Sequence, residues 1–294
     1  MKLPPPVPLA SRDPLLWACT EEGAFVLLGD HFHLLAGTQG LFLRGAVHHR
    51  GRLFLGTPQR LLELEGSRTR VVRRIEVSCL AVDGWGDLWV GTERRGLLRA
   101  WEEGWKTYRA YQPLPDDRVR GIAEDGDGLV YVGTARGLSC YDRPRWMIIS
   151  RDWVVRTVLA SPLTGRVWVA HEHGLACFLG LHLLERLEPG ALPCPILAAA
   201  DASDGSTLLV GGNRGLFWWR RGEGCEAFPL PEAAPGVPEV ATHLFCDPDG
   251  ALWVFMPGRG LGRLEGRTWT RVLGEGQGLV VPSLLSMAFC PTPT

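Results

Sequence analysis

Residues 87–97 read DLWVGTERRGL, and variants of this stretch recur along the whole chain. Each copy has an apolar run that usually holds an aromatic residue, then a small residue, a polar turn and, in most copies, Gly-Leu. Residues 129–138, LVYVGTARGL, and residues 166–175, RVWVAHEHGL, follow the same pattern. The position two residues after the aromatic is taken as the anchor of each copy. The seven anchors are Cys19, Gly56, Gly91, Gly133, Ala170, Gly211 and Phe255.

The spacing of these anchors predicts the fold. Successive anchors are 35 to 44 residues apart, which is the length of one four-stranded propeller blade. Within the third copy, short apolar runs separated by turns predict four strands, at residues 77–84, 86–92, 96–101 and 105–111. No segment has sustained helical periodicity with caps. The sequence therefore predicts an all-β protein, a seven-bladed β-propeller of four-stranded antiparallel blades that spans residues 1–294 as a single domain.

One further match makes eight blades the alternative. LLAGTQGL around Gly37 lies about 18 residues from the anchors on either side, which is too short for four strands of about 5 residues each. We therefore expect HFHLLAG (31–37) to be the last strand of blade 1. The first strand of blade 2 is then expected within residues 40–48.

The chain ends predict how the ring closes. Blade 1 lacks a first strand before its anchor, whereas residues 283–290, SLLSMAFC, are a spare strand after blade 7. A ring must pair its last blade with its first or leave exposed strand edges. We expect residues 283–290 to form the innermost strand of blade 1. The repeat also predicts a buried aromatic residue two positions before six of the anchors, at Trp17, Phe54, Trp89, Tyr131, Trp168 and Trp253.

Composition narrows the setting in which the protein works. The net charge is −1 over 294 residues, which argues against binding to nucleic acid or to an anionic membrane. Apolar runs are too short for a membrane-spanning helix, and the N-terminus lacks the apolar core of a signal peptide. Eight cysteines without a CxxC pair favour free thiols and therefore a cytoplasmic location. The use of 29 arginines against two lysines indicates a GC-rich, bacterial genome.

The repeat resembles a known family. In its clearest form, the repeat reads LWVGT or a variant, a turn with Gly-Leu, an aromatic strand and then V-x-x-(I/L)-A-x-D. This order is similar to the two-component-regulator propeller repeat, most clearly in residues 77–97 and 119–138. This resemblance implies a propeller fold. It also implies a sensing role, since such propellers are commonly the sensor part of hybrid histidine kinases. Here no kinase or receiver sequence accompanies the propeller.

The turn after the second strand of each blade indicates a binding face. The residue before the turn glycine is Arg136 in blade 4, His173 in blade 5 and Arg214 in blade 6. Blade 5 departs from its siblings by reading His171-Glu172-His173-Gly174. In the projected fold, three further residues lie nearby, namely Arg120 and Arg156 early in the first strands of blades 4 and 5, and Trp153 in the loop between them. The predicted anion-attracting site consists of Arg120, Arg136, Trp153, Arg156, His171, His173 and Arg214. The alternative is that Arg-Gly-Leu is simply a common turn in an arginine-rich chain.

No motif in the sequence predicts catalysis. GxSxG, a P-loop and HExxH are all missing. His171 and His173 could bind a metal or transfer protons, as histidines do in propeller lyases of the virginiamycin B type. The plain alternative is an exposed polar turn. We therefore expect a non-catalytic binding or scaffold propeller without metal or cofactor. Its partner is expected to be an acidic protein or peptide, held by one monomeric ring within a complex. The alternatives are a ligand-sensing propeller that acts with a separate signalling protein and a lyase or hydrolase.

Overall fold

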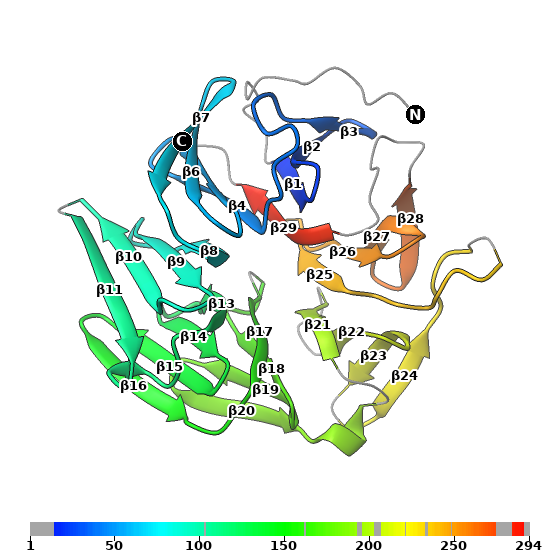
Figure 1. Ribbon diagram of the computed structural model, residues 1–294. Helices are drawn as coiled ribbons and strands as arrows, with labels where there is room; N and C mark the ends of the chain where they lie inside the picture. The colour runs from blue at the N-terminus through cyan, green and yellow to red at the C-terminus, as the bar shows by residue number, and fades with distance from the viewer. Residues whose placement is uncertain are drawn as a thin grey trace.

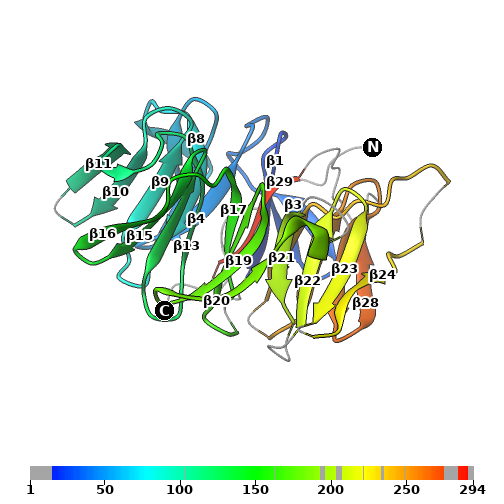
Figure 2. The ribbon, with the colours of Figure 1, turned by 90° about the horizontal axis from the view of Figure 1, so that it is seen from below.

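The fold is a ring of seven antiparallel sheets (Figure 1). The computed structural model describes residues 15–274 and 284–290, apart from 103, 162, 193–195, 203–206, 221, 233–234 and 248. Seen from the side, the strands run roughly along the axis of the ring (Figure 2). The prediction of seven four-stranded blades is confirmed, and the blades are numbered here in chain order.

The first three blades use the N-terminal part of the chain. Blade 1 contains β29 (Leu284–Cys290), β1 (Leu15–Thr20), β2 (Ala24–Leu28) and β3 (His31–Leu34). Blade 2 contains β4 (Gly45–His49), β5 (Arg52–Gly56), β6 (Leu61–Glu65) and β7 (Arg68–Arg73). Blade 3 contains β8 (Val77–Val82), β9 (Leu88–Thr92), β10 (Leu97–Trp101) and β11 (Gly104–Ala110), with β12 (Pro113–Leu114) added in parallel at its outer edge.

The remaining four blades follow the same order. Blade 4 contains β13 (Val119–Glu124), β14 (Val130–Thr134), β15 (Gly137–Asp142) and β16 (Arg145–Ser150). Blade 5 contains β17 (Val155–Ala160), β18 (Val167–His171), β19 (Gly174–Leu179) and β20 (His182–Leu187). Blade 6 contains β21 (Ile196–Asp201), β22 (Thr207–Gly212), β23 (Gly215–Arg220) and β24 (Gly224–Phe228), after a short 3-10 turn, η1 (Pro189–Ala191). Blade 7 contains β25 (His243–Cys246), β26 (Leu252–Met256), β27 (Gly260–Glu265) and β28 (Thr268–Leu273).

The stretch around Gly37 is a connection between blades. It lies between β3 and β4, so the eight-bladed alternative is wrong. The first strand of blade 2 begins at Gly45 and not near residue 40, because residues 41–44 form the end of that connection. In blade 1, β29 pairs antiparallel with β1 and places Trp17 opposite Ala288.

Most anchor residues are small, four of them glycine, because the next blade packs against them; Phe255 in blade 7 is the exception. All seven lie in the second strand of their blade. A Cβ atom on Gly56 would lie 2.5 Å from Cγ1 of Val77, and one on Gly133 would lie 2.4 Å from Cγ1 of Val155. These valines begin the first strands of the following blades. The anchor therefore sets how closely successive innermost strands approach.

The aromatic residues near the anchors form the core between blades. All six predicted aromatic residues are buried, with at most 7% of each exposed. In the turns after the second strands, Gly96 has φ +76° and Gly215 has φ +118°, values that favour glycine. In the described residues, no helix is long and apolar enough to cross a membrane.

Buried thiols give a first prediction. Cys79, Cys140, Cys177 and Cys246 are free, and burial raises the pKa of the first three to about 12 and that of Cys246 to about 11. At pH 8 only about one in 10⁴ thiols with a pKa near 12 is ionised. We expect the buried Cys140, Cys177 and Cys246 to resist an aromatic disulfide reagent in native protein and all eight cysteines to react after denaturation. Cys79 is half-buried and lines a cavity, so it should react sooner than these three. A denatured, unreduced count well below eight would contradict free thiols.

Candidate functional site

In blades 3 to 6, one position near the start of the innermost strand is turned toward the axis of the ring. The pairing of the first and second strands shifts register between Val77 and Cys79, between Val119 and Gly121, between Val155 and Thr157, and between Ile196 and Ala198. Each shift is a β-bulge, which leaves one extra residue that a regular strand would not accommodate. The extra residues in blades 3 to 6 are Ser78, Arg120, Arg156 and Leu197.

These bulges lie at one end of the ring. Val155 pairs with His171, the last residue of β18, so the start of each first strand lies beside the end of the second. The turns after the second strands and the loops between blades therefore share this end, which we call the turn face. In blade 2, Arg44 takes the equivalent place, because Leu43 donates from N to the carbonyl of Thr20 as Val77 does to Thr57.

The bulge residues line a cavity of about 380 Å³ between the innermost strands, which we call the channel cavity. Its walls come from the first strands of blades 3 to 7 and from Arg44. The size is in the range of small-molecule pockets. Side chains of β29 are outside the described residues, so the wall on that side is left undescribed.

Charge in the channel cavity is positive. Arg44 forms an ion pair with Glu93. Arg120 and Arg156 are exposed, and neither has an ion-pair partner among the described residues. No described residue of the cavity wall is acidic. The structure therefore brings together two of the predicted site residues on neighbouring blades, with their charge unneutralised.

The rest of the wall combines polar side chains, among them Ser78, Thr157, Thr242 and His243, with apolar ones. Ile122, Leu159, Leu197 and Phe245 all line the channel cavity, and Leu197 remains 37% exposed. The Phe245 ring lies parallel to Trp253, with centroids 6.3 Å apart and an interplanar angle of 4°. The cavity thus combines two cationic side chains with a partly exposed apolar surface.

Trp153, His171 and His173 form a separate cluster beside blade 5. The rings of Trp153 and His171 stack, with centroids 4.1 Å apart and an interplanar angle of 1°. His171 is only 3% exposed, so the expected exposed turn is wrong for this residue. His173 is exposed and lies 3.4 Å from Glu172 as a candidate ion pair. The described residues contain no group of three or more His, Cys, Asp or Glu that could hold a metal ion.

His171 gives a pH prediction. Burial lowers its pKa from 6.5 to about 4, so the unfolded chain takes up a proton between these pH values while the folded protein does not. The unfolding free energy should fall by about 3 kcal/mol from this group as pH drops from 7 to 4. In urea titrations, the unfolding free energy of the wild type should fall by about 3 kcal/mol more than that of His171→Phe as the pH drops from 7 to 4. His182→Gln, which changes an exposed histidine on β20, should retain the wild-type pH dependence. Parallel profiles for wild type and His171→Phe would contradict the assignment.

The other two predicted residues lie farther out on the turn face. Arg136 and Arg214 are exposed in the turns of blades 4 and 6. In the same turns of blades 3 and 7, Arg95 lies 3.9 Å from Glu76 and Arg259 donates to the carbonyl of Pro231. The turns therefore do not present a continuous ring of free charge.

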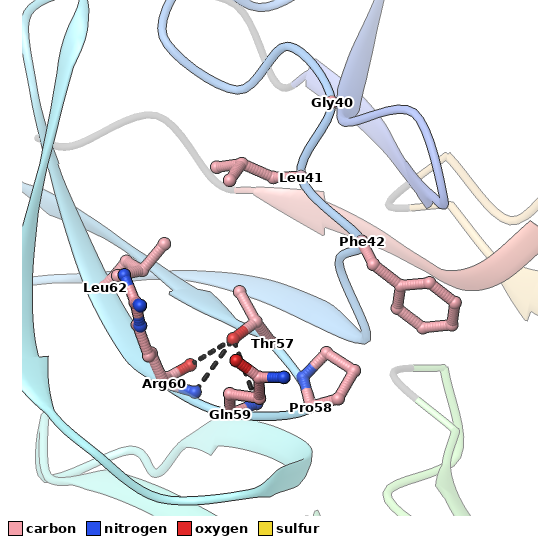
Figure 3. A pocket seen from close by; sticks show the side chains of 8 residues that line it. All are labelled: Gly40, Leu41, Phe42, Thr57, Pro58, Gln59, Arg60 and Leu62. Carbon is pink, nitrogen blue, oxygen red and sulfur yellow. Dashed lines mark hydrogen bonds between the residues drawn. The ribbon is translucent and has the colours of Figure 1, made fainter.

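A second hollow of about 320 Å³ lies on the turn face between blades 1 and 2. Leu41 and Phe42 border it on one side, and Pro58 and the Thr57 turn border it on the other (Figure 3). Thr57 Oγ1 accepts a hydrogen bond from the backbone N of Arg60 at 2.8 Å. Phe42 remains 37% exposed.

Sequence reasoning missed Arg44, Leu197 and Phe245 as cavity residues. The signal for the first two was present, because both occupy the place in their blades that Arg120 and Arg156 occupy in theirs. Extending that alignment to every blade would have found them. Phe245 carries no such signal.

Comparison with known proteins agrees with this architecture. Residues 113–136 match the two component regulator propeller family model, and this segment overlaps the repeat copy at residues 119–138. One repeat of this seven-bladed propeller is therefore of the two-component-regulator type. No curated protein matches this propeller by sequence.

Several solved structures are similar to the propeller. The extracellular domain of a putative hybrid two component system from B. thetaiotaomicron has a TM-score of 0.68 and 18% identity, covering 84% of this chain and 36% of that one. PorZ, a surface component of the type-IX secretion system of Porphyromonas gingivalis, has a TM-score of 0.61 and 16% identity, covering 90% and 46%. Virginiamycin B lyase from Staphylococcus aureus has a TM-score of 0.60 and 13% identity, covering 81% and 84%. The propeller spans less than half of the first two chains, and at these identities the likeness shows the fold alone.

Proposed function

We propose that this propeller is a non-catalytic binding module that holds an anionic group of its partner between Arg120 and Arg156. The observation that carries the proposal is the pair of exposed, unneutralised guanidinium groups on the wall of the channel cavity, which has no acidic residue among its described lining. Guanidinium groups bind carboxylate and phosphate through paired, charge-assisted hydrogen bonds. An anionic group is therefore the natural complement of this site.

A sensing role follows as part of the same proposal. The family repeat and the likeness to the extracellular domain of a putative hybrid two component system support a role as an input unit. Occupancy of the channel cavity would then be read by a separate signalling protein. The buried free thiols of Cys140, Cys177 and Cys246 support our further proposal that the protein works in a reducing compartment, the cytoplasm.

The anion site is tested with benzoate and with benzamidine, which has a similar shape and the opposite charge. By calorimetry, we expect benzoate to bind the wild type and benzamidine not to bind. Replacing both Arg120 and Arg156 by Ala should weaken benzoate binding at least about 100-fold, because each charge-assisted hydrogen bond contributes about 1.5–3 kcal/mol and at least two are lost. The melting temperature should be unchanged, since both side chains are exposed.

The matched control replaces Arg68 and Arg145, two exposed arginines on the outer strands β7 and β16, by Ala. It removes the same total charge and should retain benzoate binding. The proposal is wrong if the two double variants bind alike or if benzamidine competes with benzoate.

A protein or peptide that docks on the turn face is the second candidate, favoured by the hollow between blades 1 and 2 (Figure 3). Phe42 is exposed there beside Pro58, and Arg60 lies at the same hollow. An acidic segment with one large apolar side chain would suit this combination. The test is co-purification from the native host. The wild-type propeller should recover one partner protein reproducibly, and Phe42→Asp should not recover it. Equal recovery by the variant would contradict this candidate.

A further inference from the structure

We infer that the ligand of the channel cavity is a small amphipathic organic anion, with its charged head at Arg120 and Arg156 and its apolar body along the cavity wall. This inference rests on the proposed anion site and specifies what kind of anion occupies it. It excludes inorganic phosphate and other anions that have no apolar body.

The residues at the bulge position are the first evidence for a ligand with one charged and one apolar part. Blades 4, 5 and 6 carry Arg120, Arg156 and Leu197 at the same structural place. The bulge re-aims this residue toward the axis in each blade. A ligand held by the two arginines therefore lies beside an aliphatic side chain that is 37% exposed. Covering that surface would add affinity only for a ligand with an apolar part.

The apolar surface continues along the innermost strands away from the turn face. Leu159 lies three residues beyond Arg156 on β17, a separation of about 10 Å in an extended strand. Ile122, two residues beyond Arg120, and Phe245 on β25 line the same cavity. All three remain partly exposed. The parallel contact with Trp253 gives the Phe245 ring a fixed support.

Size decides between kinds of anion. A cavity of about 380 Å³ matches a small molecule and not a folded protein segment. A bare inorganic anion would fill a small part of it and leave the apolar wall in contact with water. A carboxylate or phosphate ester with an apolar body about 10 Å long could contact both the arginine pair and the apolar side chains of the wall.

The test measures the affinity of straight-chain carboxylates from acetate to octanoate by calorimetry, with octanol and octylamine as uncharged and cationic controls. We expect affinity to rise about three- to fourfold per methylene, as burial of each CH₂ predicts. The gain should end once the chain reaches the length of the cavity. Octanol and octylamine should bind at least tenfold more weakly than octanoate.

Two sets of variants assign the two ends of the ligand. Replacing Arg120 and Arg156 together by Ala should lower the binding affinity of every carboxylate by a similar factor. Leu197→Ser, at an exposed site, and Leu159→Ser should reduce the gain per methylene and leave acetate unchanged. Melting curves identify any variant that fails to fold. If Leu159→Ser does not fold, Leu197→Ser decides the test, because the Leu197 side chain is more exposed than that of Leu159.

The outcomes separate the two proposals. If acetate and octanoate bind equally and both require the arginines, the anion site stands and the amphipathic ligand is wrong. If octanoate binds equally to wild type and to the arginine double variant, or if octanol binds as tightly as octanoate, both proposals are wrong. An affinity that rises with chain length and depends on the arginines supports both.

Discussion

Truncation of the chain after Ser283 is expected to abolish cooperative folding. The cut removes β29, which pairs with β1 along six residues from Leu15 to Thr20. It also removes the innermost strand that lies between β25 and β4. The ring would be left with an open edge on β1, and unpaired edges promote aggregation. We expect the truncated protein to be insoluble or to lose its sigmoidal urea transition, measured by tryptophan fluorescence.

Truncation after Cys290 is the matched control, because it keeps all of β29. This shorter deletion should retain the wild-type melting temperature. A soluble protein cut after Ser283 with an unchanged melting temperature would contradict closure of the ring through β29.

Trp253→Ala is expected to cost about 3–5 kcal/mol of unfolding free energy, as large aromatic deletions do. The side chain is 4% exposed and packs with Leu16 and Phe25 of blade 1, so it joins blade 7 to blade 1. Its indole Nε1 donates to Oδ2 of Asp247 at 3.0 Å. The variant therefore leaves both a cavity and a buried carboxylate with one fewer donor. Urea denaturation at neutral pH measures the loss.

Trp85→Ala is the control for this substitution. Trp85 is 66% exposed at a turn of blade 3, and the guanidinium of Arg143 lies 5.1 Å from its ring centroid. Losing this exposed contact should cost less than about 1 kcal/mol. Equal losses for Trp85→Ala and Trp253→Ala would contradict the assignment of Trp253 to the core between blades.

The fold could be predicted because each blade repeats the same physical constraint. An aromatic residue two positions before the anchor is buried against the next blade, and a small anchor such as Gly133 lets Val155 approach. These constraints are local in sequence and each recurs in six of the seven blades, so their spacing reveals the architecture. The exact start of β4 was missed because residues 41–43 are apolar without being a strand.

The candidate site was predicted only in part, because contacts across the ring have no local signal. Arg120 and Arg156 were found from their equal places in two blades. The burial of His171 under Trp153 was missed, since a histidine before a turn reads as exposed. The apolar wall was also missed, because Leu197 and Phe245 reach the channel cavity from strands that lie far from Arg120 in the chain.

The most direct test of the proposed binding site is anomalous diffraction from crystals of the full chain that hold 4-bromobenzoate. Its bromine can be located without ambiguity, and its carboxylate reports the anion site. We predict the ring in the channel cavity, with carboxylate oxygens about 2.7–3.2 Å from guanidinium nitrogens of Arg120 and Arg156 and the bromine directed toward Leu159 and Phe245. Bromine ordered only outside the channel cavity, with both guanidinium groups free of carboxylate, would contradict the account.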